Sequence, residues 1–242
     1  MPVIRHDRQV LVKVTAVTVN PIDTYIRSGA YPIALPRPFI IGRDLVGVVD
    51  AVGAGVTRFA PGQRVWSNNQ GYGGRQGTFA EFVSVDEELL YPLPDGVKEQ
   101  EAVAVVHSAL TACLGLIREA GLKAGETLFI NGGSGNVGSA VLQVARHLGA
   151  RVIVTAGSTE KLRRCLELGA DRAVNYKTED VAAAIRDFAP QGVDVSMHGF
   201  AITNATTQEL FRRSTQFNIA ARPARNRARA WCPSCFLKPA SV

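Results

Sequence analysis

Hydrophobic and polar residues alternate along the first part of the chain. Between residues 9 and 20, β-branched residues alternate with polar ones at the period of a half-buried strand. A second apolar run at residues 39–56 is interrupted by four glycines, and a Pro-Gly turn and another short strand follow it. Short strands at this spacing predict a small barrel or sandwich-like all-β unit over residues 1–97.

The pattern becomes helical near residue 97. Apolar residues at 99–121 form a helical stripe without a proline, and a strand, a glycine turn and a helix follow at 126–150. A second strand starts at residue 151, its helix follows at 158–170, and a third strand lies at 172–176. Alternating strands and helices of this size predict βαβ units and a parallel sheet, so the expected fold class is α/β.

Three glycines lie at the turn after the first of these strands. Gly133, Gly135 and Gly138 fit G-x-G-x-x-G, with an apolar strand before them and an apolar helix after them. One glycine allows the tight bend, the second lets the backbone approach a pyrophosphate, and the third packs helix on strand. The helix N-terminus offers unpaired N–H groups to the phosphates. The motif predicts a dinucleotide site, the alternative being a turn without a ligand; a Walker A loop is excluded because no Gly-Lys-Ser/Thr follows.

The end of the second strand distinguishes between dinucleotides. A ribose-binding acid there would indicate NAD, but no acid precedes Glu160 in VTAGSTEKLRR. Ser158, Lys161 and two arginines, at positions 163 and 164, would instead offer donors and positive charge to a 2′-phosphate. NADPH is therefore the favoured cofactor, although the same charges could form a solvated helix face.

Charge and cysteine content bear on location and partners. The net charge is +6, but residues 210–242 hold six arginines and one lysine without an acid, so the basicity belongs to that segment. Four cysteines are few and mostly scattered, which favours a reducing compartment, and the single C-x-x-C of Cys232 and Cys235 is weak evidence for zinc or redox chemistry. The first ten residues lack the apolar core of a signal peptide, and no window approaches the run of about 18 apolar residues that a membrane span needs. We expect a cytoplasmic protein without a membrane partner.

Several segments together resemble a known family. They are VNPIDTYIRSGAYP at 19–32, the glycine-rich run at 39–65, GTFAEFVSVDEELLYPLPDGV at 77–97, HSALTACLGL at 107–116, NGGSGNVG and TAGSTEKL. In this order they are similar to the zinc-independent quinone oxidoreductases of the medium-chain dehydrogenase/reductase superfamily, the zeta-crystallin-like NADPH:quinone reductases, over about residues 9–195. The resemblance implies a GroES-like β domain joined to a Rossmann domain, with the active site between them.

Carried over by position, the resemblance implies roles for particular residues. Asn20 and Tyr25 would line the site as the catalytic pair near nicotinamide and substrate, and Thr111 would approach the nicotinamide. The remaining cofactor contacts would come from Gly133, Ser134, Gly135, Asn136, Val137 and Gly138 at the pyrophosphate, and from Gly157, Ser158, Lys161 and Tyr176 at the adenosine end. Asn20 before Pro21 also fits an ordinary turn, and Tyr25 fits a half-buried aromatic residue.

The sequence argues against a catalytic zinc. VTVNPID has no Cys or His where zinc-dependent relatives carry a cysteine, and Gly-Arg-Asp replaces their Gly-His-Glu. No metal is therefore expected, and the nicotinamide would carry the hydride chemistry. His107 and His147 lie on apolar helical stretches, for which the pattern favours packing roles.

The resemblance ends after GVDVS. MHGFAITNATTQELF looks like a much later family segment, so about 60 residues of strand-helix units are expected to be missing, and the first β-strands as well. The expected domains are 1–97, GroES-like; 98–198, an incomplete Rossmann domain of three strands; and 199–242, a disordered basic tail without strand periodicity. Nucleic-acid binding by that tail is the weaker reading.

Two functions remain open at this stage. The first is an NADPH-dependent, zinc-independent oxidoreductase that transfers hydride to a quinone or another activated carbonyl or alkene. The alternative is a catalytically inactive isoform or fragment with residual nucleotide binding. A small-molecule quinone or enone is the expected partner, and a homo-oligomer is expected only if the fold is complete enough.

Overall fold

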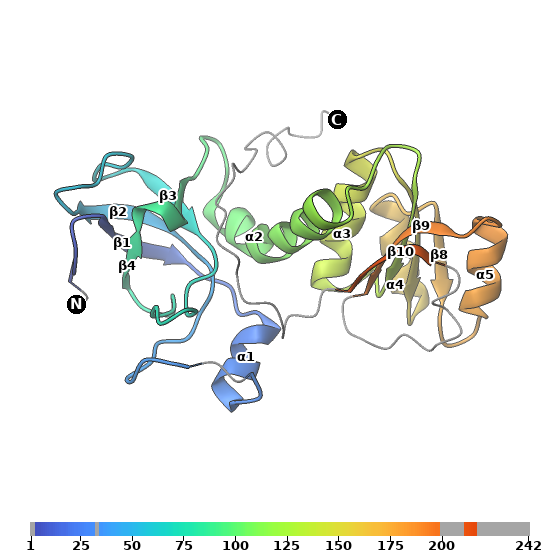
Figure 1. Cartoon of the computed structure of the whole chain (residues 1–242), viewed down its shortest axis with the longest axis horizontal. Coiled ribbons are helices and arrows are strands. Elements are labelled where there is room, and N and C mark those ends of the chain that lie inside the picture. The colour runs from blue at the N-terminus through green and yellow to red at the C-terminus, as the bar shows by residue number, and fades with distance from the viewer. Residues whose placement is uncertain (1–2, 32–33, 199–210, 217–242) are drawn as a thin grey trace.

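A computed structural model describes residues 3–31, 34–198 and 211–216 of the chain. Two sheets lie towards opposite ends of the molecule, and helix α2 (Glu99–Cys113) runs between them (Figure 1). A π-helical turn, η2 (Leu114–Glu119), continues α2 directly. The fold class is α/β, as predicted.

The first sheet is antiparallel and has the strand order β4-β1-β2-β3-β5. Its strands are β1 (Gln9–Ala16), β2 (Leu45–Val52), β3 (Arg64–Ser67), β4 (Phe82–Asp86) and β5 (Leu90–Pro92), with the 3-10 turn η1 (Glu87–Leu89) before β5. Buried and partly exposed residues alternate along β3 and β4, as expected of strands with one face in a core. Valines and leucines of these strands form that core.

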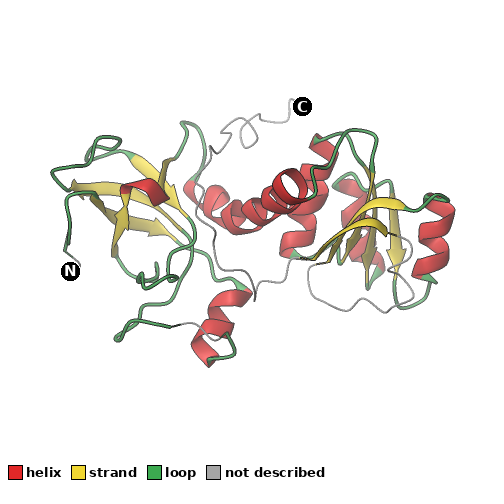
Figure 2. Cartoon of the chain, viewed as in Figure 1, coloured by secondary structure: helices red, strands yellow, loops and turns green. Residues whose placement is uncertain are grey.

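The second sheet is parallel, with the strand order β10-β9-β6-β7-β8. Its strands are β6 (Thr127–Asn131), β7 (Arg151–Ala156), β8 (Arg172–Asn175), β9 (Val193–His198) and β10 (Phe211–Gln216), and its helices are α3 (Asn136–His147), α4 (Thr159–Glu167) and α5 (Val181–Phe188). Leu128 and Ile130 of β6 join one core, whereas Phe129 joins another that includes Ile185 of α5. Helices therefore cover both faces, as a parallel sheet requires (Figure 2).

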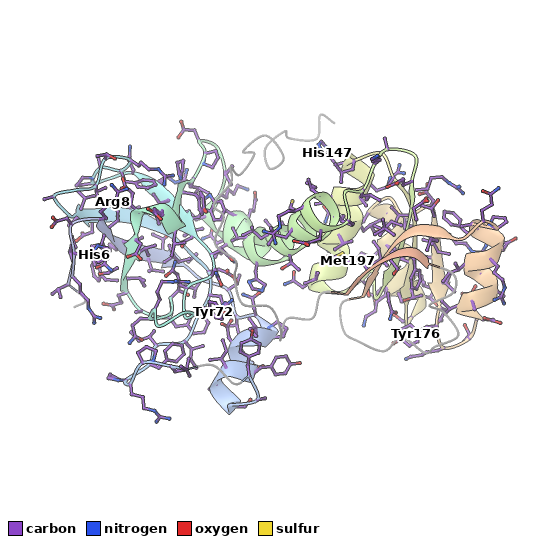
Figure 3. The ribbon with its side chains drawn as sticks, viewed as in Figure 1. His6, Arg8, Tyr72, His147, Tyr176 and Met197 are labelled. Carbon is purple, nitrogen blue, oxygen red and sulfur yellow. The ribbon has the colours of Figure 1, made fainter. Side chains whose placement is uncertain are left out.

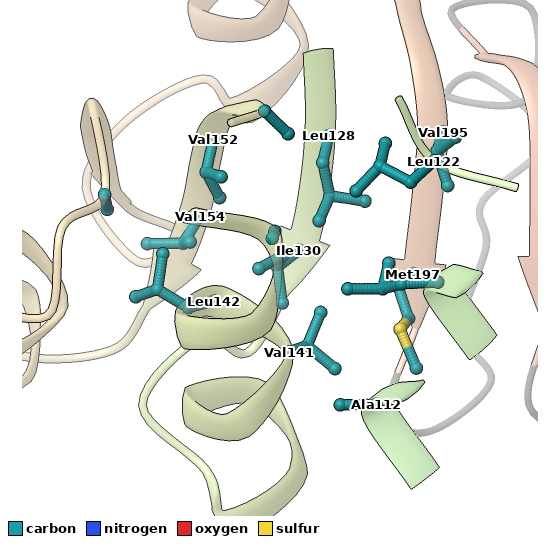
Figure 4. Close-up of a cluster of buried hydrophobic side chains, with 14 of the residues drawn as sticks. Ala112, Leu122, Leu128, Ile130, Val141, Leu142, Val152, Val154, Val195 and Met197 are labelled. Atoms are coloured by element: carbon teal, nitrogen blue, oxygen red, sulfur yellow. The ribbon is translucent and has the colours of Figure 1, made fainter. Parts of the chain in front are cut away.

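The larger core unites the sheet with α2, η2 and α3. Ala112 of α2 and Leu116 of η2 belong to the same buried cluster as Ile130 of β6 and Val141 of α3 (Figure 4). At its other end α2 places Ala102 and Val103 against Val46 of β2. One helix thus contributes to a core on each sheet.

Helix α1 (Pro21–Ser28) follows the first predicted strand directly and was not predicted from the sequence, where Asn20 before Pro21 fitted an ordinary turn. A proline is compatible with the first position of a helix, because the N–H it lacks has no partner there. Gly29 ends the helix in a left-handed conformation with φ 75°. The Pro and Gly that suggested a loop are therefore the two ends of a short helix.

The parallel sheet has more strands than the sequence predicts. β9 and β10 extend it beyond the expected three, and β10 lies in the segment where the pattern indicates no strand. Arg213 of β10 pairs with Val195 of β9 in parallel register. Such a pairing depends on a neighbour far along the chain, which local periodicity does not record. Cys232, Cys235 and the rest of the basic tail lie outside the described residues.

Helix α2 with η2 also differs from expectation in its apolar character. Glu99–Glu119 is, among the described residues, one helix long and apolar enough to cross a membrane, which the sequence analysis did not expect. Of its most apolar window, 39% is buried inside the molecule. A buried core helix meets the same criteria, so this is weak evidence for a span, and residues of the helix belong to both cores.

We expect Leu116→Ala to lower the free energy of unfolding by about 2–5 kcal/mol, because it leaves a cavity in a packed core. Leu116 is fully buried, whereas its neighbour Ile117 is 42% exposed. Ile117→Ala is the matched control and should cost much less. Urea unfolding followed by circular dichroism measures both, and equal losses would contradict the role given to η2 in this core.

Candidate functional site

A fully buried carboxylate, Asp44, lies at the centre of a polar group just before β2. Its Oδ2 accepts hydrogen bonds from Asn20 Nδ2 at 2.6 Å and from Thr18 Oγ1 at 3.1 Å. Its Oδ1 accepts one from Asn68 Nδ2 and lies 3.5 Å from His107 Nδ1. We call these five residues the Asp44 hub. The hub brings four separate segments of the chain together at the Asp44 carboxylate.

Asn20 is held by its backbone as well as by its side chain. It is 3% exposed and precedes α1, and its N–H donates to Asp23 Oδ2 at 2.7 Å. Burial raises the pKa of Asp23, and the nearby carboxylate of Asp44 adds to the rise. Two acidic side chains thus fix the position of Asn20, which is more than an ordinary turn requires.

Helix α2 brings Thr111 next to the hub. The hydroxyl of Thr111 donates to the backbone oxygen of His107 at 2.9 Å, and the two residues lie one helical turn apart on the same face. Tyr25 lies on α1 and is 38% exposed. The structure therefore places Asn20, Thr111 and Tyr25 on elements at or beside the hub, and their contacts with a substrate stay a prediction.

The sequence analysis missed Asp44 and gave His107 only a packing role. The structure corrects this, because His107 Nδ1 faces a buried carboxylate. His147, for which the sequence also favours packing, is exposed at the end of α3 (Figure 3). The available signal was Asp44 itself, since an acid that opens an apolar strand is buried and must find partners.

The three motif glycines between β6 and α3 differ in whether their surroundings leave room for a side chain. A Cβ on Gly133 would lie 2.7 Å from Val154 Cβ, and one on Gly138 would lie 2.1 Å from the oxygen of Gly132. A Cβ on Gly135 would meet nothing closer than 3.5 Å, and its φ of −73° suits any residue. Packing thus demands glycine at 133 and 138, whereas at 135 the space beyond the backbone is open.

Thr155 of β7 fixes this turn, a role that the sequence did not reveal. Its hydroxyl accepts a hydrogen bond from Gly132 N–H at 3.0 Å and donates to Asn131 Oδ1 at 2.9 Å. Its backbone oxygen accepts from Gly133 N–H at 2.9 Å. Thr155 is 1% exposed, so the turn is anchored to a buried strand.

The start of α3 fits a phosphate group. Gly135 is the N-cap and has no side chain to satisfy the first N–H groups of the helix, and its first turn has no acid. Those groups belong to Asn136, Val137 and Gly138, with Ser134 in the turn before them. Free helix N–H groups beside an open backbone position are suited to an anion.

The end of β7 brings the other predicted cofactor residues together. A Cβ on Gly157 would lie 2.4 Å from the Tyr176 hydroxyl oxygen, so the tyrosine is packed against this glycine. Tyr176 is 55% exposed and follows β8 (Figure 3). Ser158 caps α4 by accepting from Lys161 N–H at 3.4 Å. The three loops after β6, β7 and β8 meet at the carboxyl edge of the sheet, where α/β folds bind ligands.

Arg43 lies between the hub and the surface. Its Nη2 donates to Asn69 Oδ1 at 2.8 Å, and the guanidinium carbon lies 5.4 Å from the centre of the Tyr72 ring (Figure 3). Burial lowers the pKa of Arg43, while the Asp44 and Asp23 carboxylates favour its charge. Within the described ranges, no three His, Cys, Asp or Glu side chains are grouped so that they could hold a metal ion.

Two family models match the chain. The model of the alcohol dehydrogenase GroES-like domain matches residues 6–95, and that of the zinc-binding dehydrogenase matches residues 136–215. The quinone oxidoreductase of Sus scrofa is 37% identical over 202 residues, which are 83% of this chain and 60% of the relative. That of Pseudomonas aeruginosa is 38% identical over 178 residues, 74% of this chain and 53% of the relative.

Solved structures give the same picture. A quinone oxidoreductase of Pseudomonas syringae has a TM-score of 0.77 and 33% identity, covering 87% of this chain and 62% of its own. The Escherichia coli quinone oxidoreductase complexed with NADPH has a TM-score of 0.76 and 27% identity, over 87% and 63% of the two chains. The present chain spans about 60% of the length of the first curated relatives.

We expect Gly138→Ala to lower the free energy of unfolding by about 1–3 kcal/mol, because its Cβ would overlap the Gly132 carbonyl. Alanine normally favours a helix over glycine, so a loss identifies the close contact as its cause. Gly135→Asn is the control and should leave stability unchanged or slightly raised, because Asn is a favourable residue at this N-cap and the position is open. Thermal unfolding of both variants measures the difference; a stabilised Gly138→Ala would refute the tight packing of this turn.

Proposed function

The chain belongs to the zeta-crystallin-like quinone oxidoreductases of the medium-chain dehydrogenase/reductase superfamily, and from this we propose that it is an NADPH-dependent oxidoreductase. It transfers hydride to a quinone or another activated carbonyl or alkene, without zinc. The observation that carries the proposal is the glycine turn, where Gly135 is open although its neighbours Gly133 and Gly138 are closed by packing. A glycine that the fold does not need is explained by a ligand that approaches its backbone.

Bound NADPH would supply the hydride from its nicotinamide ring. The N–H groups of Asn136, Val137 and Gly138 bind the pyrophosphate, and Thr155 keeps the turn in place for it. Asn20 and Thr111 orient the nicotinamide and the acceptor from the hub side, and Tyr25 lines the acceptor site from α1. These residues act by orientation, which suits a reaction whose chemistry resides in the cofactor.

Zinc independence is supported by Arg43. Arg43 stands in the sequence where zinc-dependent relatives have a histidine ligand. Its guanidinium group carries a positive charge beside the Asp44 carboxylate. A fixed cation there would repel a divalent metal ion. In the part of the chain that the structure describes, Cys113 and Cys165 are not joined in a disulfide, which fits the proposed cytoplasmic location.

The preference for NADPH is assigned to the start of α4. Gly157 and Ser158 follow β7, and Lys161 lies in the first turn of the helix. Arg163 forms an ion pair with Glu167 on the same helix, so it belongs to the solvated face. Arg164 lies in the last turn of α4, so Lys161, in the first turn, is the cation that we assign to the 2′-phosphate.

Gly135→Asp should weaken NADPH binding at least tenfold relative to Gly135→Asn, because only the aspartate opposes the phosphate charge. Both side chains are favourable N-caps, so the stability of the free chain should hold or rise. Fluorescence titration with NADPH and thermal unfolding test the two expectations. Equal affinity of the Asp and Asn variants would show that no phosphate lies at this turn.

Lys161→Ala should lower the affinity for NADPH about tenfold and leave that for NADH unchanged, since a charged hydrogen bond to the 2′-phosphate is lost. Arg163→Ala, two residues further along the same helix and already paired with Glu167, is the matched control. Both cofactors are titrated against each variant. If Arg163→Ala has the larger effect, the assignment of the phosphate to Lys161 is wrong.

Turnover separates the proposal from its alternative. Oxidation of NADPH at 340 nm on addition of a simple quinone would establish the oxidoreductase. Saturable NADPH binding without oxidation would favour the inactive form with residual nucleotide binding. The alternative remains because the activity of the longer relatives need not extend to a chain that spans about 60% of their length.

A further inference from the structure

His107 is only partly covered where α2 passes the Asp44 hub. Its side chain is 22% exposed, whereas its neighbours Val106 and Ser108 are buried. Nδ1 lies 3.5 Å from Asp44 Oδ1 and 3.4 Å from Asn68 Nδ2. Among the residues that the structure describes, none offers a hydrogen bond to Nε2. This second ring nitrogen is therefore the one that solvent or a ligand can reach.

Nδ1 of His107 lies between the Asp44 carboxylate and the Asn68 amide. A carboxylate only accepts hydrogen bonds, so the tautomer with a proton on Nδ1 is the one that can donate to Asp44. Asp23 of α1 and Arg43 are the other charged groups that face this region. Nε2 is left to gain and lose the exchanging proton.

Asp44 also ties His107 to the residue that orients the acceptor. Its Oδ2 accepts from Asn20 Nδ2 at 2.6 Å, while its Oδ1 faces His107. Thr111 lies one turn further along α2 and donates to the His107 carbonyl at 2.9 Å. The Asn20 amide and the His107 imidazole thus lie at one buried carboxylate, with the Thr111 hydroxyl on the next turn of α2.

Reduction of a quinone or carbonyl needs a proton as well as a hydride, because hydride alone leaves an oxyanion. We propose, on the basis of the function proposed above, that His107 is the general acid that protonates the acceptor oxygen. The Nε2–H bond of the imidazolium breaks as the O–H bond forms, and solvent returns the proton to the ring. The acceptor, one hydride from NADPH and one proton thus become the reduced acceptor and NADP⁺.

The first test compares His107→Gln with the wild-type chain. Loss of a general acid should lower kcat with a simple quinone about 100-fold or more and leave the Kd for NADPH, measured by fluorescence, within about twofold. His147→Gln, at the exposed end of α3, is the matched control and should keep the wild-type rate (Figure 3). Free imidazole should restore part of the activity of His107→Ala, which a purely structural role would not allow.

The second test does not depend on turnover. In ¹⁵N-labelled protein, the imidazole signals of His107 should show a proton on Nδ1, and duroquinone should shift its Nε2 signal but not that of His147. Duroquinone without effect on His107, or an undiminished kcat of His107→Gln, overturns the general-acid role alone. A wild-type chain that binds duroquinone and NADPH but never oxidises the cofactor overturns the proposed function, and the general-acid role with it.

Discussion

The sharing of one helix between two hydrophobic cores is the constraint on which the molecule depends. Ala102 and Val103 of α2 pack against the antiparallel sheet, and Ala112 and Leu116, farther along, pack into the core of the parallel sheet. Between these contacts lie the two polar residues of α2 that meet the hub. Because both ends of the helix are buried, its middle cannot rotate without opening one core. The orientation of His107 and Thr111 is therefore a consequence of hydrophobic packing.

In the glycine turn between β6 and α3, some glycines are required by packing and another is left open for a ligand. Gly138 allows α3 to approach β6, and Gly133 allows the turn to pass Val154, so both are required before any ligand is present. Gly135 lies between them with no neighbour to avoid. Thr155 then holds the turn through three hydrogen bonds from a strand in which every residue after Arg151 is buried. The hydrogen bonds of Thr155 hold the turn in place, and Gly135, which has open space beside it, lets a ligand approach the backbone.

Local patterns in the sequence were sufficient for elements whose determinants are close together. The strand, glycine turn and helix at 126–147 follow from periodicity and three spaced glycines, and the family resemblance supplied the domain pair. Helix α1 was not predicted, because Pro21 and Gly29 are residue types that occur at helix ends as well as in loops. β9 and β10 depend on pairing with distant strands. The Asp44 hub could not be predicted at all from local patterns, because its members come from four segments that are separated by up to 89 residues in the chain.

A buried carboxylate at the hub would be unfavourable if its neighbours did not compensate its charge. Thr18, Asn20 and Asn68 supply neutral donors, and Arg43 and His107 supply positive charge or the capacity for it. Two of the side chains that stabilise Asp44, Asn20 and His107, are thus also those proposed to act on the acceptor. Thr18 and Asn20 donate to Asp44 Oδ2, while Asn68 donates to Oδ1, which His107 also faces. Three uncharged donors therefore hold the carboxylate in place independently of His107.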